Sequence, residues 1–186
     1  MALLFAILTA IAAALTWWNE TRLEGVGRAL DGDSLLLAGE EYRLKGIDAP
    51  EFDQICDRDG KAWRCGEASR TLLARELARG ALVCLSSERD KYGRRLGVCT
   101  IAGRELNGFL VRQGAAVAYG GYEREESEAR DAKRGVWASR FDRPQDWRAA
   151  HPHTRAPRPA PAAPGSSSAV QTAPLPPPVA TGRSLP

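Results

Sequence analysis

The stretch Tyr42–Glu51, YRLKGIDAPE, alternates charged and apolar residues and then breaks into a loop. Neighbouring side chains in a strand point to opposite faces, so we expect Leu44 to face the core and Arg43 to face away from it. Pro50 excludes a helix directly after Asp48, because the residue before a proline is driven toward extended backbone. The stretch therefore predicts a strand that carries an arginine and a loop that carries two carboxylates.

Strand-like segments and turn signals lie on both sides of this stretch. The expected strands are 26–30, 34–38, 41–47, 81–86 and 96–101, with a turn at Asp31-Gly32-Asp33. Helical spacing predicts helices over 67–79, 105–113 and 123–134, each followed by a glycine. This order indicates a mainly β, α+β domain, a five-stranded small barrel with about three helices rather than a parallel α/β sheet.

The balance of charge limits the classes of function. The chain has 186 residues and a formal charge of +3, from 26 basic and 23 acidic residues. Three of the arginines lie after residue 150 without any acid, so residues 1–150 balance at 23 against 23. A neutral body does not coat nucleic acid non-specifically. Both histidines, His151 and His153, also lie after residue 150, which removes histidine bases and histidine-ligated zinc from the body.

The N-terminus carries an uncharged run of 17 residues, ALLFAILTAIAAALTWW, at positions 2–18. This length is at the lower limit of about 17 for a membrane-spanning helix, while Ala12–Ala14 offers a small-residue cleavage site. We expect residues 1–21 to form a hydrophobic helix that is a signal peptide or a retained membrane anchor. The body would then be exported, either periplasmic or secreted. Two arginines after the run favour a cytoplasmic body instead, but two glutamates offset them.

The C-terminal composition separates a tail from the body. Ten of the twelve prolines follow residue 150, with Ala, Ser and Thr between them. Such a segment buries too little apolar surface to fold. We therefore expect a folded domain at 22–148 and a disordered tail at 149–186 that serves as a spacer. Extended binding of a partner by the tail is the alternative.

The four cysteines lack a C-x-x-C pair, which argues against a zinc site. An even number in an exported domain favours two disulfides. Cys56–Cys65 would close the charged loop CDRDGKAWRC, and Cys84–Cys99 would join two strands that we expect to be adjacent. The alternative is four reduced core thiols in a cytosolic protein.

Three charged clusters follow strand-like segments, and together they suit phosphate chemistry. They are Asp31-Gly32-Asp33, then Arg43 with Asp48 and Glu51, then Lys91-Tyr92-Gly93-Arg94. Carboxylates at loop ends suit Ca²⁺, which takes oxygen ligands in flexible geometry, and arginines suit paired phosphate oxygens. Singly, each cluster also fits a hairpin turn, a surface ion pair or an exposed turn. Jointly they describe phosphodiester cleavage without histidine.

The order of four motifs resembles the staphylococcal nuclease family over about residues 24–137. These motifs are DGDS at 31–34, YRLKGIDAPE at 42–51, DKYGRRLG at 90–97 and LNGFLVRQGAAVAY at 106–119. The resemblance implies a five-stranded OB-fold barrel with three helices. It also implies Ca²⁺ as cofactor and hydrolysis of DNA and RNA that leaves 3′-phosphate ends.

The resemblance also implies roles for individual residues. The matches to the family's catalytic trio are Arg43, Glu51 and Arg94. The matches to its calcium ligands are the Asp33 and Asp48 carboxylates and the Ala49 backbone carbonyl, and those to its nucleotide pocket are Lys91, Tyr92 and Tyr119. The segment around Tyr119 is one residue shorter than the family pattern. The loop CDRDGKAWRC, the N-terminal run and the tail lie outside the pattern.

Two other classes of function fit parts of the sequence. One is a non-catalytic module, tethered at the membrane, that keeps the barrel as a docking surface for nucleic acid or protein. The other is a membrane-tethered scaffold that works through its tail. Because all five charged positions of the family site are present, the sequence favours the enzyme, acting on DNA or RNA as a monomer without a protein partner.

Overall fold

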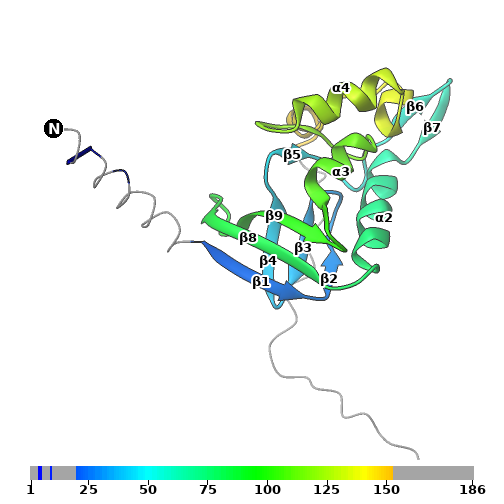
Figure 1. Cartoon of the computed structure of the whole chain (residues 1–186). Coiled ribbons are helices and arrows are strands. Elements are labelled where there is room, and N and C mark those ends of the chain that lie inside the picture. Colours follow the sequence, from blue (N-terminus) through cyan, green and yellow to red (C-terminus); the bar gives the residue numbers. More distant parts are fainter. Residues whose placement is uncertain (1–3, 6–8, 10–19, 153–186) are drawn as a thin grey trace, which may run out of the picture.

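The structure is a computed structural model that describes residues 4, 5, 9 and 20–152, and it has a mixed α+β architecture (Figure 1). Its strands are β1 (Thr21–Gly25), β2 (Gly27–Ala29), β3 (Ser34–Leu37), β4 (Glu40–Leu44), β5 (Ile47–Asp48), β6 (Cys56–Arg58), β7 (Lys61–Trp63), β8 (Leu82–Arg89), β9 (Arg95–Ile101), β10 (Arg104–Glu105) and β11 (Val117–Ala118). Its helices are α2 (Cys65–Leu77), α3 (Leu106–Arg112), α4 (Glu123–Asp131), the 3₁₀ helix η1 (Gly135–Ala138) and α5 (Pro144–Ala150).

The main sheet has seven strands and curls into a half-barrel (Figure 1). Its order is β1-β8-β9-β4-β3-β2, with β10 paired to β9. All pairs are antiparallel except β4 with β9, which run parallel with Arg43 opposite Leu96. This pairing brings the start of β9 beside the strand that carries Arg43.

The core lies between one face of this sheet and helices α2 and α3. Strand β4 alternates as its sequence predicts, with Tyr42 and Leu44 buried and Arg43 only partly buried. The sheet residues Leu35 and Leu37 pack in one cluster with side chains of α2 and α3, namely Leu73, Leu77, Leu106 and Leu110. Burial of these side chains fixes β3 and β4, and so fixes the loops at their ends.

Most of the expected elements are present with small shifts in their bounds. The five expected strands correspond to β2, β3, β4, β8 and β9, and the three expected helices to α2, α3 and α4. Strands β1 and β10 extend the sheet beyond five, and within residues 20–152 helix α5 adds a fourth α-helix. The third strand ends at Leu44 rather than at residue 47, because the chain turns at Lys45–Gly46 before β5. Helix α5 continues two residues past the expected end of the body at 148.

Both expected disulfides are confirmed. Cys56–Cys65 joins β6 to the first residue of α2, and Cys84–Cys99 joins paired residues of β8 and β9. The segment between Cys56 and Cys65 is not the simple loop that the sequence suggested, since β6 and β7 form a hairpin there. Behind this hairpin a second small core gathers both cysteines with Val117 and Val136.

The expected N-terminal hydrophobic helix and the expected disordered tail fall almost wholly outside the described residues. Of the run at 2–18, only residues 4, 5 and 9 are described, and the description ends at residue 152. Within the described part of the chain, no helix combines the length and the apolar character needed to cross a membrane.

Candidate active site

Strands β3 and β4 bring the first two charged clusters together. Ser34 pairs with Arg43 across the two strands, and the Leu44 amide donates a hydrogen bond of 2.8 Å to the Asp33 carbonyl. Gly32 holds the Asp31–Asp33 turn close to its neighbours, because a Cβ at that position would lie 2.7 Å from the Ala49 side chain. The turn is thereby packed against the loop that follows β5.

Two buried carboxylates converge on one arginine nitrogen. Nη2 of Arg43 lies 2.9 Å from Oδ2 of Asp33 and 2.5 Å from Oδ1 of Asp48. The Asp33 and Asp48 side chains are only 3% and 2% exposed, against 18% for Arg43. The Ala49 amide adds a hydrogen bond of 2.9 Å to Oδ2 of Asp33. Charges this buried persist only when paired, so the guanidinium and the two carboxylates form one electrostatic unit.

The pKa values of Asp33 and Arg43 are both raised, but for different reasons. Burial raises the pKa of Asp33 to about 8, although the neighbouring Arg43 charge opposes that shift. For Arg43, burial disfavours the charge, but Asp33 and Asp48 outweigh it and raise its pKa. Asp33 therefore holds a proton more tightly than an ordinary aspartate, while Arg43 stays cationic.

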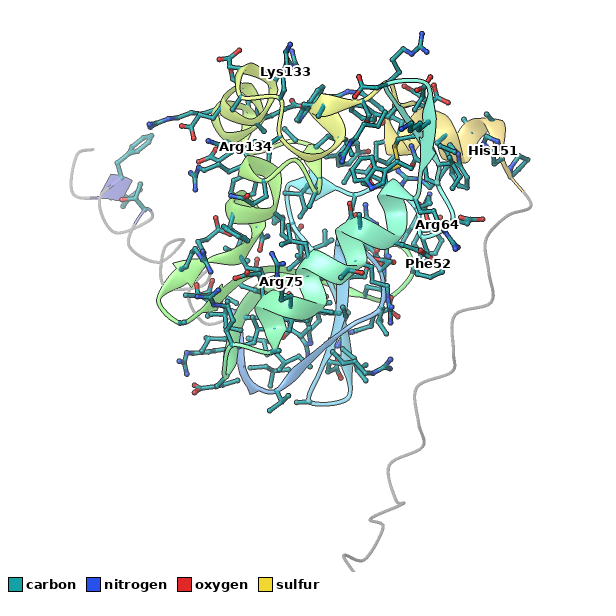
Figure 2. The ribbon with its side chains drawn as sticks, turned by 90° about the vertical axis from the view of Figure 1, so that its right-hand side faces the viewer. Phe52, Arg64, Arg75, Lys133, Arg134 and His151 are labelled. Atoms are coloured by element: carbon teal, nitrogen blue, oxygen red, sulfur yellow. A yellow bond between two sulfur atoms is a disulfide. The ribbon has the colours of Figure 1, made fainter. Side chains whose placement is uncertain are left out.

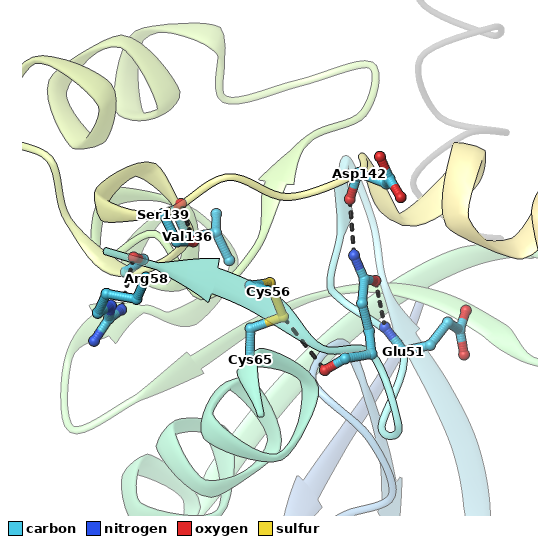
Figure 3. The surroundings of a disulfide bond; sticks show 9 residues. Glu51, Cys56, Arg58, Cys65, Val136, Ser139 and Asp142 are labelled. Carbon is cyan, nitrogen blue, oxygen red and sulfur yellow. Dashed lines mark hydrogen bonds between the residues drawn. A yellow bond between two sulfur atoms is a disulfide. The ribbon is translucent and has the colours of Figure 1, made fainter. Parts of the chain in front are cut away.

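Glu51 lies on a loop outside the helices and strands, and the buried Gln54 side chain holds the backbone of this loop. The Gln54 side chain is fully buried and accepts a hydrogen bond of 3.2 Å from the Glu51 amide. Its amide nitrogen donates one of 2.8 Å to the Asp142 carbonyl, which Figure 3 shows beside the Cys56–Cys65 disulfide. Gly66 lets α2 approach this loop, since a Cβ there would lie 1.7 Å from the Glu51 carbonyl oxygen.

Helix α5 supplies a residue that the sequence analysis did not identify. Nη1 and Nη2 of Arg148 lie 3.0 and 2.9 Å from the two carboxylate oxygens of Asp48. Nη1 also donates a hydrogen bond of 2.9 Å to Oε1 of Glu51. Burial disfavours the charge of Arg148, but the bonds to Asp48 and Glu51 raise its pKa. Arg148 thus bridges two of the predicted site residues.

The end of α5 and the loop after Glu51 lie on the same side of the molecule. Figure 2 views the face formed by α2, with Arg75 toward one end of the helix and Arg64 at its start. Phe52, directly after Glu51, and His151, directly after α5, both lie toward the Arg64 end. His151 stacks on Trp147 with ring centroids 4.4 Å apart, which places the described end of the chain against α5.

The third cluster lies on the turn between β8 and β9. Arg94 is 8% exposed, and its Nη2 and Nε lie 2.6 and 2.7 Å from Oδ2 of Asp90. The guanidinium also lies 5.4 Å from the ring centroid of Tyr92, and the Lys91 ammonium lies 5.1 Å from the same ring. Among the residues described, no ion pair joins Arg94 to Asp33, Asp48 or Glu51.

The aromatic residues that the resemblance assigns to nucleotide binding are exposed. Tyr92 is 56% exposed and Tyr119 is 59% exposed. Tyr119 follows β11, which pairs with β5, and its amide donates a hydrogen bond of 2.9 Å to the Gly46 carbonyl. Tyr119 therefore lies beside β5, the strand that ends at Asp48, while Tyr92 lies on the same turn as Arg94.

The structure thus joins four predicted residues directly and leaves others in a separate group. Asp33, Arg43, Asp48 and Ala49 share contacts, and Glu51 joins them through Arg148. Lys91, Tyr92 and Arg94 form their own group around Asp90. Arg148 gave no signal in the sequence, because its partners lie 100 and 97 positions away. Gln54 gave no signal in the sequence either, because a lone glutamine in a loop is ordinarily exposed.

The oxygen donors present fit a calcium ion. The Asp33 and Asp48 oxygens approach a single point, now held by one Arg43 nitrogen, and Ca²⁺ accepts carboxylate, carbonyl and water oxygens in flexible geometry. No group of three or more His, Cys, Asp or Glu side chains gathers as a metal site among the described residues. A calcium ion here would therefore complete its shell with a backbone carbonyl and water.

Comparison with known proteins gives related sequences. Succinoglycan biosynthesis protein ExoI of Rhizobium meliloti (strain 1021) is 35% identical over 121 residues, which cover 61% of this chain and 63% of that protein, less than two thirds of its length. An uncharacterized endonuclease of Escherichia coli O157:H7 is 36% identical over 125 residues, covering 61% of this chain and 75% of that protein. A micrococcal nuclease of Shigella flexneri is 32% identical over 173 residues, covering 78% and 94%.

A family model also matches, and its extent bears on the site. The model described as staphylococcal nuclease homologue matches residues 41–139. This range includes Arg43, Asp48, Glu51 and Arg94, whereas Asp33 precedes it and Arg148 follows it. Since the match covers more than half of the chain, the protein belongs to the staphylococcal nuclease homologue family.

Proposed function

We propose that the protein is a calcium-dependent nuclease that hydrolyses phosphodiester bonds of DNA or RNA and leaves 3′-phosphate ends. The observation that carries this proposal is the convergence of the Asp33 and Asp48 carboxylates on one nitrogen of Arg43, with Glu51 on the loop that follows. The names of two relatives, an endonuclease and a micrococcal nuclease, support it.

The chain's own residues would divide the chemistry as follows. Asp33, Asp48 and the Ala49 carbonyl would hold the calcium ion, which when bound would supply stabilisation of negative charge on the phosphoryl oxygens. Glu51 orients a water molecule and accepts its proton as the new oxygen–phosphorus bond forms. The bond from phosphorus to the 5′-oxygen then breaks. The 5′-oxygen leaves with the bonding electron pair and takes a proton from water to become a 5′-hydroxyl, while the phosphate stays on the 3′ end.

Two arginines would stabilise the charge that grows on phosphorus, the largest contribution in sites of this kind. Arg43 already lies at the carboxylates. Arg94 is held by Asp90, so it serves the phosphate only when it shares or exchanges that bond. Lys91, Tyr92 and Tyr119 complete the proposal as the nucleotide pocket, because exposed aromatic rings stack on bases of single strands.

The remaining features of the proposal concern fold family and compartment. We propose that the curled sheet is the OB-fold barrel of the family, with β1 and β10 as additions to the five predicted strands. The two disulfides support export to an oxidising compartment, because disulfides persist there and are rare in the cytosol.

A cleavage assay with single-stranded DNA tests this function. We expect a chelator to abolish cleavage and added Ca²⁺ to restore it. The products should resist extension by a polymerase until a phosphatase removes the 3′-phosphate. Asp131→Asn, a change at an exposed carboxylate of α4, serves as the matched control and should cleave like the wild type. A folded protein that binds DNA but never cuts it would instead support the non-catalytic docking module.

A further inference from the structure

Arg148 lies at a position where it competes with the proposed calcium ion for the carboxylate of Asp48. Its two terminal nitrogens lie 2.9 to 3.0 Å from both Asp48 oxygens and from one Glu51 oxygen. It therefore uses the oxygens that a cation on Asp48 would need. A divalent cation and a guanidinium repel each other at this range, so both cannot keep full contact with Asp48.

The side chain of Arg148 is partly exposed, while the segment before its helix is held in place. The side chain is 36% exposed, twice the exposure of Arg43, so it lies at the solvent side of the carboxylates. The segment that leads into α5 is fixed by Gln54, which donates to the Asp142 carbonyl, and by the ion pair of Arg143 with Glu126. A rotation of the long side chain therefore suffices to release Asp48.

We propose that Arg148 is a third substrate-binding arginine of this active site, which holds Asp48 and Glu51 in the free protein and binds the phosphodiester when calcium occupies the carboxylates. This inference rests on the proposed nuclease function. A planar guanidinium displaced from one carboxylate is suited to another paired oxygen acceptor, and the two non-bridging phosphate oxygens of the substrate offer one.

Replacing Arg148 should change the affinities for calcium and for the phosphodiester in opposite directions. Removal of Arg148 makes the site one unit more negative and also removes the competitor for Asp48. Calcium should then bind more tightly, and the phosphodiester anion should bind more weakly. A residue that only supported the fold would change both affinities in the same direction or neither.

The test measures calcium affinity and substrate affinity separately in wild type, Arg148→Ala and Arg148→Lys. Calorimetric titration with CaCl₂, without DNA, should give a dissociation constant about tenfold lower for Arg148→Ala, within the range typical of coupling between sites. At saturating calcium, KM for a single-stranded oligonucleotide should rise about tenfold, with a smaller change in kcat. Arg148→Lys keeps the positive charge but lacks the planar guanidinium, so its two constants should lie between those of the wild type and of Arg148→Ala.

Arg124→Ala serves as the control for both constants. Arg124→Ala removes an arginine that is 87% exposed in an ion pair on α4 and should change neither constant. Unchanged or weaker calcium binding in folded Arg148→Ala, or an unchanged KM, would overturn the proposal. If Arg148→Ala does not fold, Arg148→Lys carries the same comparison. If the wild type does not cut DNA, that result contradicts the proposed nuclease function but does not decide on Arg148. The calcium titration then still decides on Arg148, together with the binding of a fluorescent oligonucleotide at saturating calcium.

Discussion

The two groups of predicted site residues are held in different ways. The carboxylate group, made of Asp33, Arg43 and Asp48, is buried and takes its residues from β4, β5 and the loop before β3. The arginine turn, Asp90–Arg94, lies within one hairpin, and its arginine is held by an acid four residues away. The first group is positioned by the whole fold and the second by its own turn. This difference predicts that the two groups respond differently to mutation, calcium and pH.

The largest expected effect is on turnover, and it comes with a contrast in stability. Arg43→Ala and Arg94→Ala should each lower kcat by about 10²–10³-fold, the usual loss for one well-aimed stabilising group. Arg43→Ala also removes the cation from buried Asp33, whereas Asp48 keeps its ion pair with Arg148. Breaking a buried pair costs about 3–5 kcal/mol. We expect calcium to restore much of that stability in Arg43→Ala but not in Arg94→Ala.

Melting curves with chelator and with calcium measure this contrast alongside the turnover assays. Arg124→Ala again serves as the control, because its ion pair with Glu128 is exposed and surface pairs contribute about 0–1 kcal/mol. Equal calcium responses in the two arginine variants would show that Arg43 and Arg94 share one environment.

The second effect separates metal binding from charge stabilisation. Asp33→Ala removes a proposed calcium ligand, so its loss of turnover should be partly recovered at higher calcium concentration. Arg94→Ala should show no such recovery, because Arg94 contacts Asp90 and not the carboxylate group. Titration of turnover with calcium in both variants measures the difference, and a calcium-independent defect in Asp33→Ala would remove Asp33 from the metal site.

A smaller effect is a pH dependence that belongs to the carboxylate group alone. Burial raises the pKa of Asp33 to about 8, so below that pH calcium must displace a proton, and its affinity should fall about tenfold per pH unit. Without calcium, the folded state keeps this proton longer than the unfolded state, so this contribution makes stability fall as pH rises from about 4 to about 8.

Asp90 provides the comparison for this titration. Burial opposes its ionisation, but the hydrogen bonds from Arg94 outweigh burial and lower the pKa. Its contribution to stability is therefore complete above the ordinary aspartate pKa of about 3.9 and is lost as pH falls through the lower folded value. Calorimetric titrations with calcium at pH 6, 7 and 9 check the prediction for Asp33. A calcium affinity that is constant over this range would contradict that prediction.

The smallest expected effect concerns the end of the chain. Truncation after Pro152 keeps α5 and the stacking of His151 on Trp147, so turnover and melting temperature should both stay unchanged. Truncation before Pro144 removes Arg148 and should lower the calcium dissociation constant and raise KM. Comparing the two truncations separates the tail from α5, and a large loss of stability on truncation after Pro152 would show that the tail docks on the body.

Much of this arrangement follows from local sequence, and the rest depends on distant contacts. Alternation in β4 predicted the directions of Arg43 and Leu44, and the spacing and expected adjacency of the cysteines predicted both disulfides. The β6–β7 hairpin was missed although Asp59-Gly60 is a common hairpin dipeptide. Helix α5 has seven residues, too few to show a helical period, with only Pro144 near its start as a signal.

The burial of the charges could not be predicted either. Asp33 and Asp48 resemble turn residues in the sequence, but both are buried. Their ion-pair partners, Arg43 and Arg148, come from β4 and α5. Arg148 meets Asp48 only after the intervening chain has folded. The shifted pKa of Asp33 and the position of Arg148 are therefore properties of the tertiary structure.

The most direct test of the central claim measures calcium binding and turnover on the same preparation. We propose that the calcium on the carboxylate group is the one that cleavage requires. We expect one functional calcium per chain. Bound calcium and cleavage of single-stranded DNA should rise at the same midpoint, and both midpoints should shift together in Asp33→Ala. Cleavage that persists in chelator, or a turnover midpoint that stays in place when the binding midpoint shifts, would contradict it.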